Sequence, residues 1–420
     1  MDISSEHNHF IDLRAKILAS PAYKERCALL FDLFQASREA GRDPNRILSI
    51  QIVLVELLLL FQTKQSEFKN ENNEIGVAIA KHLILILKQI ADSIVWRALG
   101  YDRVLIQLLA EHHSTGYLDD TVFSDFATAQ QIVEQEGAIV IINDLTTILR
   151  HGDLTVIGKN QMSVLEIKYG KASANNCRAI RQRKNLNELI NFLNKGVRIV
   201  ENRRDFIFMV DVPPKTYESI AAEVINQARQ HGYYHAMVSD CLAIEAIWLK
   251  NQKGEYPQKR PFNGVEHIMR SHNLDVFKPK SRIAPYGIYR FDNQSCFDLI
   301  SGNILLATTL NFDNLQKRYK LFGLSLELPQ PSQQEVKKYQ SVPMAERKKL
   351  MNSCKFVVRD GKNWISKTPD FFYRIGLELL CEDSFIQADR QLMNYVINVD
   401  LPDKNARFYI GYKNEREIWI

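Results

Sequence analysis

The sequence predicts a mixed α/β protein in which helices cover a sheet, preceded by a helical N-terminal region. Two observations support this class. Residues 1 to about 120 have helical patterning, and residues 121–250 alternate in the order helix, strand, hairpin, helix, strand, helix, strand. Such alternation is typical of a sheet flanked by helices. The last part of the chain mixes both patterns, so we expect an α+β protein overall.

A chain of 420 residues is too long for one compact domain. The changes in pattern predict a helical N-terminal region over 1–120 and an α/β core over 121–250. Residues 251–290, rich in Pro, Gly and basic side chains, are expected to be a basic linker or surface loop. Residues 291–420 form the mixed C-terminal region.

Composition places the chain among globular proteins, with 45% hydrophobic and 25% charged residues. The most apolar run, 47–61, is shorter than the roughly 18–20 residues that a membrane span needs, so we expect a buried core helix. The N-terminus lacks the pattern of a signal peptide, which predicts a cytoplasmic protein without a membrane partner. The six cysteines are scattered, which argues against a disulfide framework or a structural zinc site.

The N-terminal region is expected to contain two long helices. Asp43-Pro44 supplies an N-cap and a proline at the first helical position before the apolar run. The polar stretch "KQSEFKNENNEIG" predicts a loop. A second helix is expected over 77–98, ended by Gly100.

The expected core elements follow in order. A helix over 121–136 ends before Gly137, and 138–142 is a β-rich run. Residues 143–150 fit either a short helix or a continued strand. After the hairpin, the pattern predicts the remaining elements: a helix near 175–193, a buried strand over 205–212, a helix over 216–230 and a strand region in "HAMVSDCLAIEAIWL".

The C-terminal region has fewer signals. A basic helix is expected near 333–351, and Asp360-Gly361 predicts a hairpin between "KFVV" and "NWIS". A helix and a closing strand should follow. No pattern here indicates a function.

The stretch "GDLTVIGKNQMSVLEIK", residues 152–168, predicts a β-hairpin with a charged face. If the loop is centred between Lys159 and Asn160, Asp153 lies directly opposite Glu166, with Cβ atoms about 4.5–5.5 Å apart. Glu166 and Lys168 then share a face. The arrangement requires a loop of even length, because an odd loop would put the two carboxylates on opposite faces.

Two facing carboxylates repel unless a cation lies between them. Mg²⁺ is a suitable cation, because it needs only one or two carboxylates together with water and phosphate oxygens. Lys168 could orient or deprotonate a metal-bound water, and such a site can hydrolyse phosphodiesters. The alternative is an amphipathic hairpin whose charges face solvent.

These residues resemble the PD-(D/E)xK nuclease superfamily, whose core is a helix, three strands, a helix and a strand. The resemblance covers about residues 120–212, and it implies a restriction-endonuclease-like mixed sheet flanked by helices. Five Asp/Glu-x-Lys triplets occur in the chain, but only that at Glu166 lies in a β-patterned strand opposite an aspartate. No proline precedes Asp153, which departs from the motif.

Several residue roles follow from the resemblance. Asp153 and Glu166 would be metal ligands, with the backbone carbonyl of Ile167 as a further ligand, and Lys168 would be the catalytic lysine. The superfamily often adds a glutamate from the preceding helix, for which Glu134 is favoured over Glu136. Gln182 would supply the polar residue of the following helix.

Positive charge is concentrated in two segments. Lys171–Arg204 holds nine basic residues against two acidic ones, and Lys250–Arg290 holds nine against three. This asymmetry suggests a polyanionic partner. Arg178, Arg181 and Gln182 share a helical face. We expect the basic residues of this segment to approach the phosphate backbone, namely Lys171, Arg178, Arg181 and Lys184.

Together these features predict a cytoplasmic metal-dependent endonuclease that uses Mg²⁺, with Mn²⁺ as the alternative ion. The resemblance favours DNA over RNA as substrate, because most of the superfamily cuts DNA. The N- and C-terminal regions would serve a protein partner or homo-oligomerisation. The alternative is an inactive nuclease-like scaffold that binds nucleic acid or protein.

Overall fold

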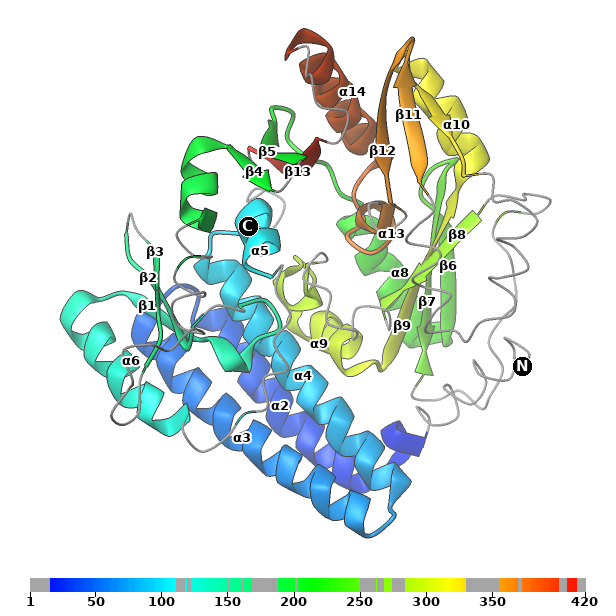
Figure 1. Cartoon of the computed structure of the whole chain (residues 1–420). Coiled ribbons are helices and arrows are strands. Elements are labelled where there is room, and N and C mark those ends of the chain that lie inside the picture. The colour runs from blue at the N-terminus through cyan, green and yellow to red at the C-terminus, as the bar shows by residue number, and fades with distance from the viewer. Residues whose placement is uncertain are drawn as a thin grey trace.

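The computed structural model in Figure 1 confirms a mixed α/β protein. The structure describes residues 16–110, 118, 122–149, 152–159, 162–167, 184, 188–200, 203–249, 262, 268–273, 284–329, 355–368, 372–399 and 406–413. Its described strands form four separate sheets of three or four strands each. The basic helix expected near 333–351 lies outside the described residues.

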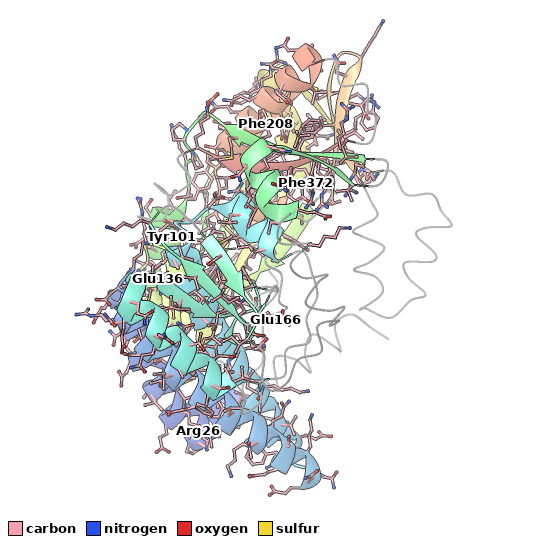
Figure 2. All side chains as sticks on the ribbon, turned by 60° about the vertical axis from the view of Figure 1, so that its left-hand side comes forward. Arg26, Tyr101, Glu136, Glu166, Phe208 and Phe372 are labelled. Atoms are coloured by element: carbon pink, nitrogen blue, oxygen red, sulfur yellow. The ribbon has the colours of Figure 1, made fainter. Side chains whose placement is uncertain are left out.

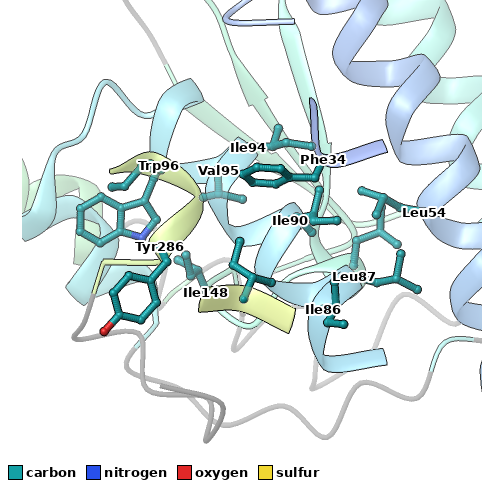
Figure 3. Close-up of a cluster of buried hydrophobic side chains, with 14 of the residues drawn as sticks. Phe34, Leu54, Ile86, Leu87, Ile90, Ile94, Val95, Trp96, Ile148 and Tyr286 are labelled. Atoms are coloured by element: carbon teal, nitrogen blue, oxygen red, sulfur yellow. The ribbon is translucent and has the colours of Figure 1, made fainter. Parts of the chain in front are cut away.

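Three long helices form the N-terminal part of the core: α2 (Pro21–Glu39), α3 (Pro44–Asn70) and α4 (Glu74–Ala98). As predicted, Asp43 caps α3, because its side chain accepts a hydrogen bond from the Arg46 N–H at 3.0 Å. Figure 3 shows side chains of all three helices converging with Ile148 and with Tyr286 of the short 3-10 helix η4 (Tyr286–Ile288). The N-terminal helices therefore pack against much later parts of the chain.

Helix α3 differs from the prediction at its C-terminal end. It continues to Asn70, so the expected loop after residue 63 is largely helical. Tight packing explains the extension, because a Cβ at Gly76 of α4 would lie 2.6 Å from the Phe68 ring of α3. By length and composition α3 would suffice to cross a membrane, but half of its most apolar window is buried inside the protein. It contributes eight buried residues to the fold, as expected of a core helix.

The sheet that carries the hairpin is small and antiparallel. It has the order β1 (Ile139–Ile142), β2 (Leu154–Ile157) and β3 (Met162–Leu165). All four residues of β1 are buried, since α3 and α6 (Val122–Glu136) pack against this strand. The short 3-10 helix η1 (Asn143–Leu145) follows β1, which resolves the alternatives left open for this segment in favour of a helical turn.

A larger sheet has the order β6 (Tyr233–Met237), β7 (Leu242–Trp248), β9 (Ile304–Asn311) and β8 (Ile268–His272). Helix α8 (Glu218–His231) packs on it, and α9 (Asn293–Ser301) precedes β9. The expected linker over 251–290 thus contains a sheet strand, β8, and the buried turn η4. Composition predicted a surface loop because the stretch is rich in Pro, Gly and basic residues, but Tyr286 and Ile288 within it are buried.

A third sheet joins distant parts of the chain. Strand β5 (Arg203–Val210) pairs antiparallel with β4 (Val197–Val200) and parallel with β13 (Arg407–Tyr412). A restriction-endonuclease-like core would place the strand after the helix in the same sheet as β1–β3. Among the described residues, β5 instead belongs to this separate sheet, and only its Asp205 and Val210 are buried.

The remaining elements form a second hydrophobic cluster at the C-terminal end. It contains the sheet β10 (Ser325–Glu327), β11 (Phe356–Asp360) and β12 (Asn363–Lys367), whose β11–β12 hairpin turns at Asp360-Gly361 as predicted. Helices α10 (Phe312–Leu321), α13 (Tyr373–Gly376) and α14 (Glu382–Val399) surround it.

The hydrophobic core does not follow the boundaries expected from the sequence. One continuous cluster includes residues of the N-terminal helices, of β1 and β2, of α8 and of α9. Helix α5 (Arg103–Leu109) also packs against β13 near the end of the chain. The helical N-terminal region and the α/β core are therefore packed as one unit rather than as two.

Candidate active site

The β2–β3 hairpin has the register that the sequence predicted. Leu154 pairs with Leu165 and Ile157 with Met162, which leaves a loop of four residues. The ladder ends at the Leu154–Leu165 pair, and Asp153 and Glu166 are the next residue of each chain segment; the Asp153 N–H bonds to the Leu165 carbonyl. Both side chains are partly exposed. The even-length loop on which the predicted site depends is therefore present.

The Asp153 carboxylate is held at the end of the hairpin. Its Oδ2 accepts the Ile167 N–H at 2.6 Å, and its own N–H donates to the Leu165 carbonyl at 2.8 Å. A hydrogen bond to an ionised carboxylate is about twice as strong as one between neutral groups. The bond joins Asp153 to the peptide directly after Glu166, so both acidic residues are fixed to one short piece of backbone.

Gly152 makes this close approach possible. Its φ is +64°, a conformation that residues with a side chain rarely adopt. A Cβ there would lie 2.5 Å from Val164 Cγ1 and 2.7 Å from the Leu165 carbonyl oxygen. A side chain at this position would push apart the two strand ends that carry the carboxylates.

Asn143, at the end of β1, braces the other side of Asp153. Its N–H donates to the Asp153 carbonyl at 2.9 Å, and its Nδ2 donates to the Gly152 carbonyl at 3.2 Å. Its Oδ1 accepts the Thr155 hydroxyl at 2.8 Å. Asn143 is buried, so these bonds are shielded from water. The sequence analysis did not identify Asn143 as part of the site, although an asparagine directly after an apolar strand could have indicated it.

A second brace comes from α4. The buried Asp92 accepts the Thr147 N–H at 2.7 Å on one oxygen and the Thr147 hydroxyl at 2.5 Å on the other. This contact ties the segment between η1 and Gly152 to the N-terminal helices. Sequence analysis could not find it, because the two residues are 55 positions apart and belong to different predicted regions.

The glutamates proposed from the preceding helix lie elsewhere. Glu134 and Glu136 are exposed in the last turn of α6, and Glu134 accepts a hydrogen bond from Gln130 at 2.8 Å. This turn leads into the start of β1, whose Ile139 pairs with Ile157, whereas Asp153 lies beyond the other end of that ladder. Figure 2 shows Glu136 and Glu166 well apart. The structure therefore does not bring these glutamates to the carboxylate pair.

Several predicted site residues lie outside the described part of the chain: Lys168, Lys171, Arg178, Arg181 and Gln182. Lys184 is described and exposed, and its Nζ lies 3.8 Å from Glu188 Oε1. An exposed pair of this kind contributes little to stability, so Lys184 remains a candidate for phosphate contact.

The chemistry of the carboxylate pair suits a hard divalent cation. Within the described ranges, no group of three or more His, Cys, Asp or Glu side chains is placed to hold a metal. Mg²⁺ needs only one or two carboxylates, with water and phosphate oxygens completing its shell. A carboxylate has roughly four acceptor sites, so the bond from Ile167 to Asp153 is compatible with metal coordination. Asp153, Glu166 and the Ile167 carbonyl, the predicted ligands, offer oxygen atoms of the kind that Mg²⁺ prefers.

Comparison with known proteins identifies no relative: no protein-family model matches the chain, and no significant match was found among curated proteins or solved structures. The function must therefore be argued from the geometry of the site.

Proposed function

We propose that the protein is a metal-dependent nuclease that hydrolyses phosphodiester bonds, with DNA as the preferred substrate. The observation that supports the proposal is the Asp153 carboxylate at the end of the β2–β3 ladder, which accepts the Ile167 N–H at 2.6 Å, directly after Glu166. Two carboxylates held near each other are electrostatically unfavourable without a cation. The metal ion of a nuclease would offset this repulsion, whereas a hairpin that only faces solvent offers no such compensation.

In this proposal Asp153, Glu166 and the Ile167 carbonyl hold Mg²⁺. The bound ion would lower the pKa of a coordinated water and neutralise charge on the phosphate. Lys168, two residues after Glu166 in the sequence, would orient the attacking water by donating a hydrogen bond to it. The roles of Asn143 and Asp92 are indirect, since they hold the backbone around Asp153 by hydrogen bonds. The finer fold assignment, a restriction-endonuclease-like core, belongs to the same proposal and rests on α6 and the β1–β3 sheet alone, because β5 lies in a separate sheet.

Pre-organisation supports the assignment. Catalytic groups must be held within a fraction of an ångström of their productive positions by their neighbours. Asp153 is linked through its side chain to Ile167 and through its backbone to Asn143 and Leu165. A hairpin whose charges only face solvent has no need for a buried asparagine and a positive-φ glycine on either side of one carboxylate.

The test is nuclease activity of the full chain on mixed DNA and RNA, with Mg²⁺, with Mn²⁺ and with a chelator. We expect metal-dependent cutting of DNA by the wild type and its loss in Lys168→Ala and Asp153→Asn. Lys69→Ala is a matched control, because Lys69 belongs to another Glu-x-Lys triplet and is exposed on α3. This variant should cut like the wild type.

A second readout separates metal binding from cutting. Calorimetric titration with Mn²⁺ should show binding that is weakened in Asp153→Asn and Glu166→Gln but retained in Lys168→Ala. Folded protein that cuts neither substrate and binds no metal would overturn the proposal and favour a nuclease-like scaffold without activity.

A further inference from the structure

The sheet β4–β5–β13 has two unlike faces. On its inner face, the fully buried Asp205 pairs with Arg198 at 2.9 Å and with Arg203 at 2.7 Å, and Tyr409 joins the main core. On its outer face, register places Val197 beside Phe206, and Phe206 beside Phe408. Ile199 lies on the same outer face, opposite Arg204.

The outer face exposes apolar side chains at the β4 end. Ile199 is 74% exposed and Val197 is 38% exposed, and both belong to a regular strand. Isolated exposed apolar residues are common, but a contiguous apolar patch on a sheet usually marks a binding surface.

Aromatic rings continue this patch across the sheet. Phe206 and Phe408 are partly exposed and stack with ring centroids 5.4 Å apart and an interplanar angle of 19°. Helix α14 covers part of the face, where the Tyr395 ring contacts Phe208 at a centroid distance of 5.4 Å and the edge of Phe408 at 6.3 Å. Figure 2 shows Phe208 in the upper part of the molecule. Ile199, Val197, Phe206 and Phe408 together form what we call the outer platform.

Charge at the platform is positive. Of the four arginines in the three strands, Arg198, Arg203 and Arg407 lie with the buried Asp205 on the inner face. Arg204 is exposed on the outer face itself, and Lys195 is exposed just before β4. The outer platform is therefore accompanied by two exposed cations, Arg204 and Lys195.

The positive charge distinguishes between two possible binding partners of the platform, a second copy of the chain and a polyanion. Packing the platform against the platform of a second copy of the chain would bring the Arg204 side chains of both copies into one interface, and such a juxtaposition of like charges is unfavourable. A polyanion is attracted to Arg204 and Lys195. Aromatic faces additionally favour unstacked bases, which are available in single strands but not inside a duplex.

We propose that the outer platform binds single-stranded nucleic acid, with bases on Phe206, Phe408 and Ile199 and phosphates on Arg204 and Lys195. This deepens the proposed nuclease function by assigning a substrate-binding surface away from the carboxylate pair. Binding to the platform can be measured without cutting, so the platform proposal and the nuclease proposal can be tested separately.

The experiment measures binding of the full chain to short labelled oligonucleotides by fluorescence anisotropy in the presence of a chelator. Single-stranded DNA, single-stranded RNA and duplex DNA are compared. We expect tighter binding of the single strands, weakened about tenfold by Ile199→Glu and by Arg204→Glu. Phe206→Leu and Phe408→Leu keep apolar volume but remove the ring, and each should also weaken binding several-fold.

Two matched controls lie on α10. Leu321→Glu places the same new charge at a residue that is 85% exposed, and Lys320→Glu reverses an exposed charge. Neither should change single-strand binding beyond a small electrostatic effect. Circular dichroism must show that all variants are folded.

Equal effects of the α10 and platform variants would overturn the proposal, as would preference for duplex. Concentration-dependent dimers that Ile199→Glu abolishes, without any nucleic-acid binding, would show instead that the platform joins two copies. Single-strand binding at the platform without metal-dependent cutting would support the platform proposal and contradict the proposed nuclease function. Metal-dependent cutting that is unaffected in Ile199→Glu and Arg204→Glu would support the nuclease function and contradict the platform proposal.

Discussion

At the scale of single residues, the position of Asp153 depends on neighbours that carry no charge. Gly152 allows the two strand ends to approach, and Asn143 ties the Gly152 and Asp153 carbonyls to β1. The acidic residues therefore supply the chemistry, whereas a glycine and a buried amide supply their placement.

Gly152→Ala should destabilise the fold and abolish metal-dependent cutting, because the added Cβ collides with Val164 and with the Leu165 carbonyl. Gly137→Ala is the matched control: its φ of +60° is similar, but a Cβ there meets nothing within 4 Å. The control should lose about 1–2 kcal/mol of unfolding free energy from backbone strain alone. Urea denaturation of both variants measures the difference, and equal losses would contradict the role given to Gly152.

A second residue-scale prediction concerns Glu218, in the first turn of α8. Burial raises the pKa of Glu218 to about 7, although hydrogen bonding to the Arg290 backbone and the charges of Arg290 and Arg38 oppose the shift. Among the described residues, its Oε1 has no hydrogen-bond partner. The folded state therefore holds a proton that the unfolded chain releases at lower pH.

Stability should consequently fall as pH rises from about 4.5, the ordinary pKa, to about 7, the folded value. Glu218→Gln should remove this loss and be more stable than the wild type by on the order of 3 kcal/mol at pH 8, with little difference at pH 4.5. Urea denaturation across this range measures the effect. Glu223→Gln, exposed on the same helix, should follow the wild type; identical pH dependence in Glu218→Gln would refute the assignment.

At the scale of elements, the β1–β3 sheet ends at a side chain instead of another strand. The buried Gln51 of α3 donates to the Val140 carbonyl at 2.8 Å and accepts the Ile142 N–H at 2.8 Å. Its amide thus pairs with the outer edge of β1 as a neighbouring strand would. A polar residue in the most apolar stretch of the sequence is explained by this contact.

Gln51→Leu should destabilise the protein by about 3 kcal/mol, because it leaves two buried backbone groups without partners. Hydrogen exchange of the Ile142 amide should also become faster. Glu56→Gln, exposed on the same helix, should change stability by less than about 0.5 kcal/mol. Unchanged protection of Ile142 in Gln51→Leu would show that the edge does not depend on this side chain.

At the scale of the whole molecule, buried ion pairs join the two ends of the chain. Glu378 pairs with Arg103 of α5, with Arg374 at 2.9 Å and with the Ala284 N–H at 2.9 Å. The Arg103 guanidinium also lies over the Trp96 ring, 5.4 Å from its centroid. Burial acts to raise the pKa of Glu378, but the two arginines hold it below its ordinary value. The N-terminal helices and the C-terminal part should therefore unfold together.

Glu378→Gln keeps the shape of the side chain but leaves two buried arginines without a counter-charge, so we expect a loss of about 3–5 kcal/mol. Because the folded pKa is depressed, this difference should persist above pH 4.5 and shrink at lower pH as the wild-type carboxylate is protonated. Glu327→Gln, whose partner Arg359 is exposed, should cost less than about 1 kcal/mol. Equal losses of unfolding free energy in Glu378→Gln and Glu327→Gln would contradict a stabilising role for the buried ion pairs of Glu378.

Local patterns in the sequence were enough to predict most helices and strands and the register of the β2–β3 hairpin. Helix caps and turns act through their own backbone and nearest neighbours, so the helix ends and the hairpin turn that they set could be predicted directly. The examples are Asp43-Pro44, Gly100, Gly137 and Asp360-Gly361. The register of the β2–β3 hairpin belongs to the same class, because loop length sets hairpin register. Glu134 failed as a ligand candidate because the place of a helix end relative to a strand end is not a local property.

The sequence by itself therefore determined the mixed α/β class, the principal helices and the register of the β2–β3 hairpin, since these depend on periodicity, caps and turns within a few residues. Only the tertiary structure decided that Gln51 closes the sheet edge, that Asn143 and Asp92 brace the site, and that β13 completes a sheet with β5. The physical reason is that buried polar groups must find partners wherever the folded chain provides them, and those partners lie tens to hundreds of residues away.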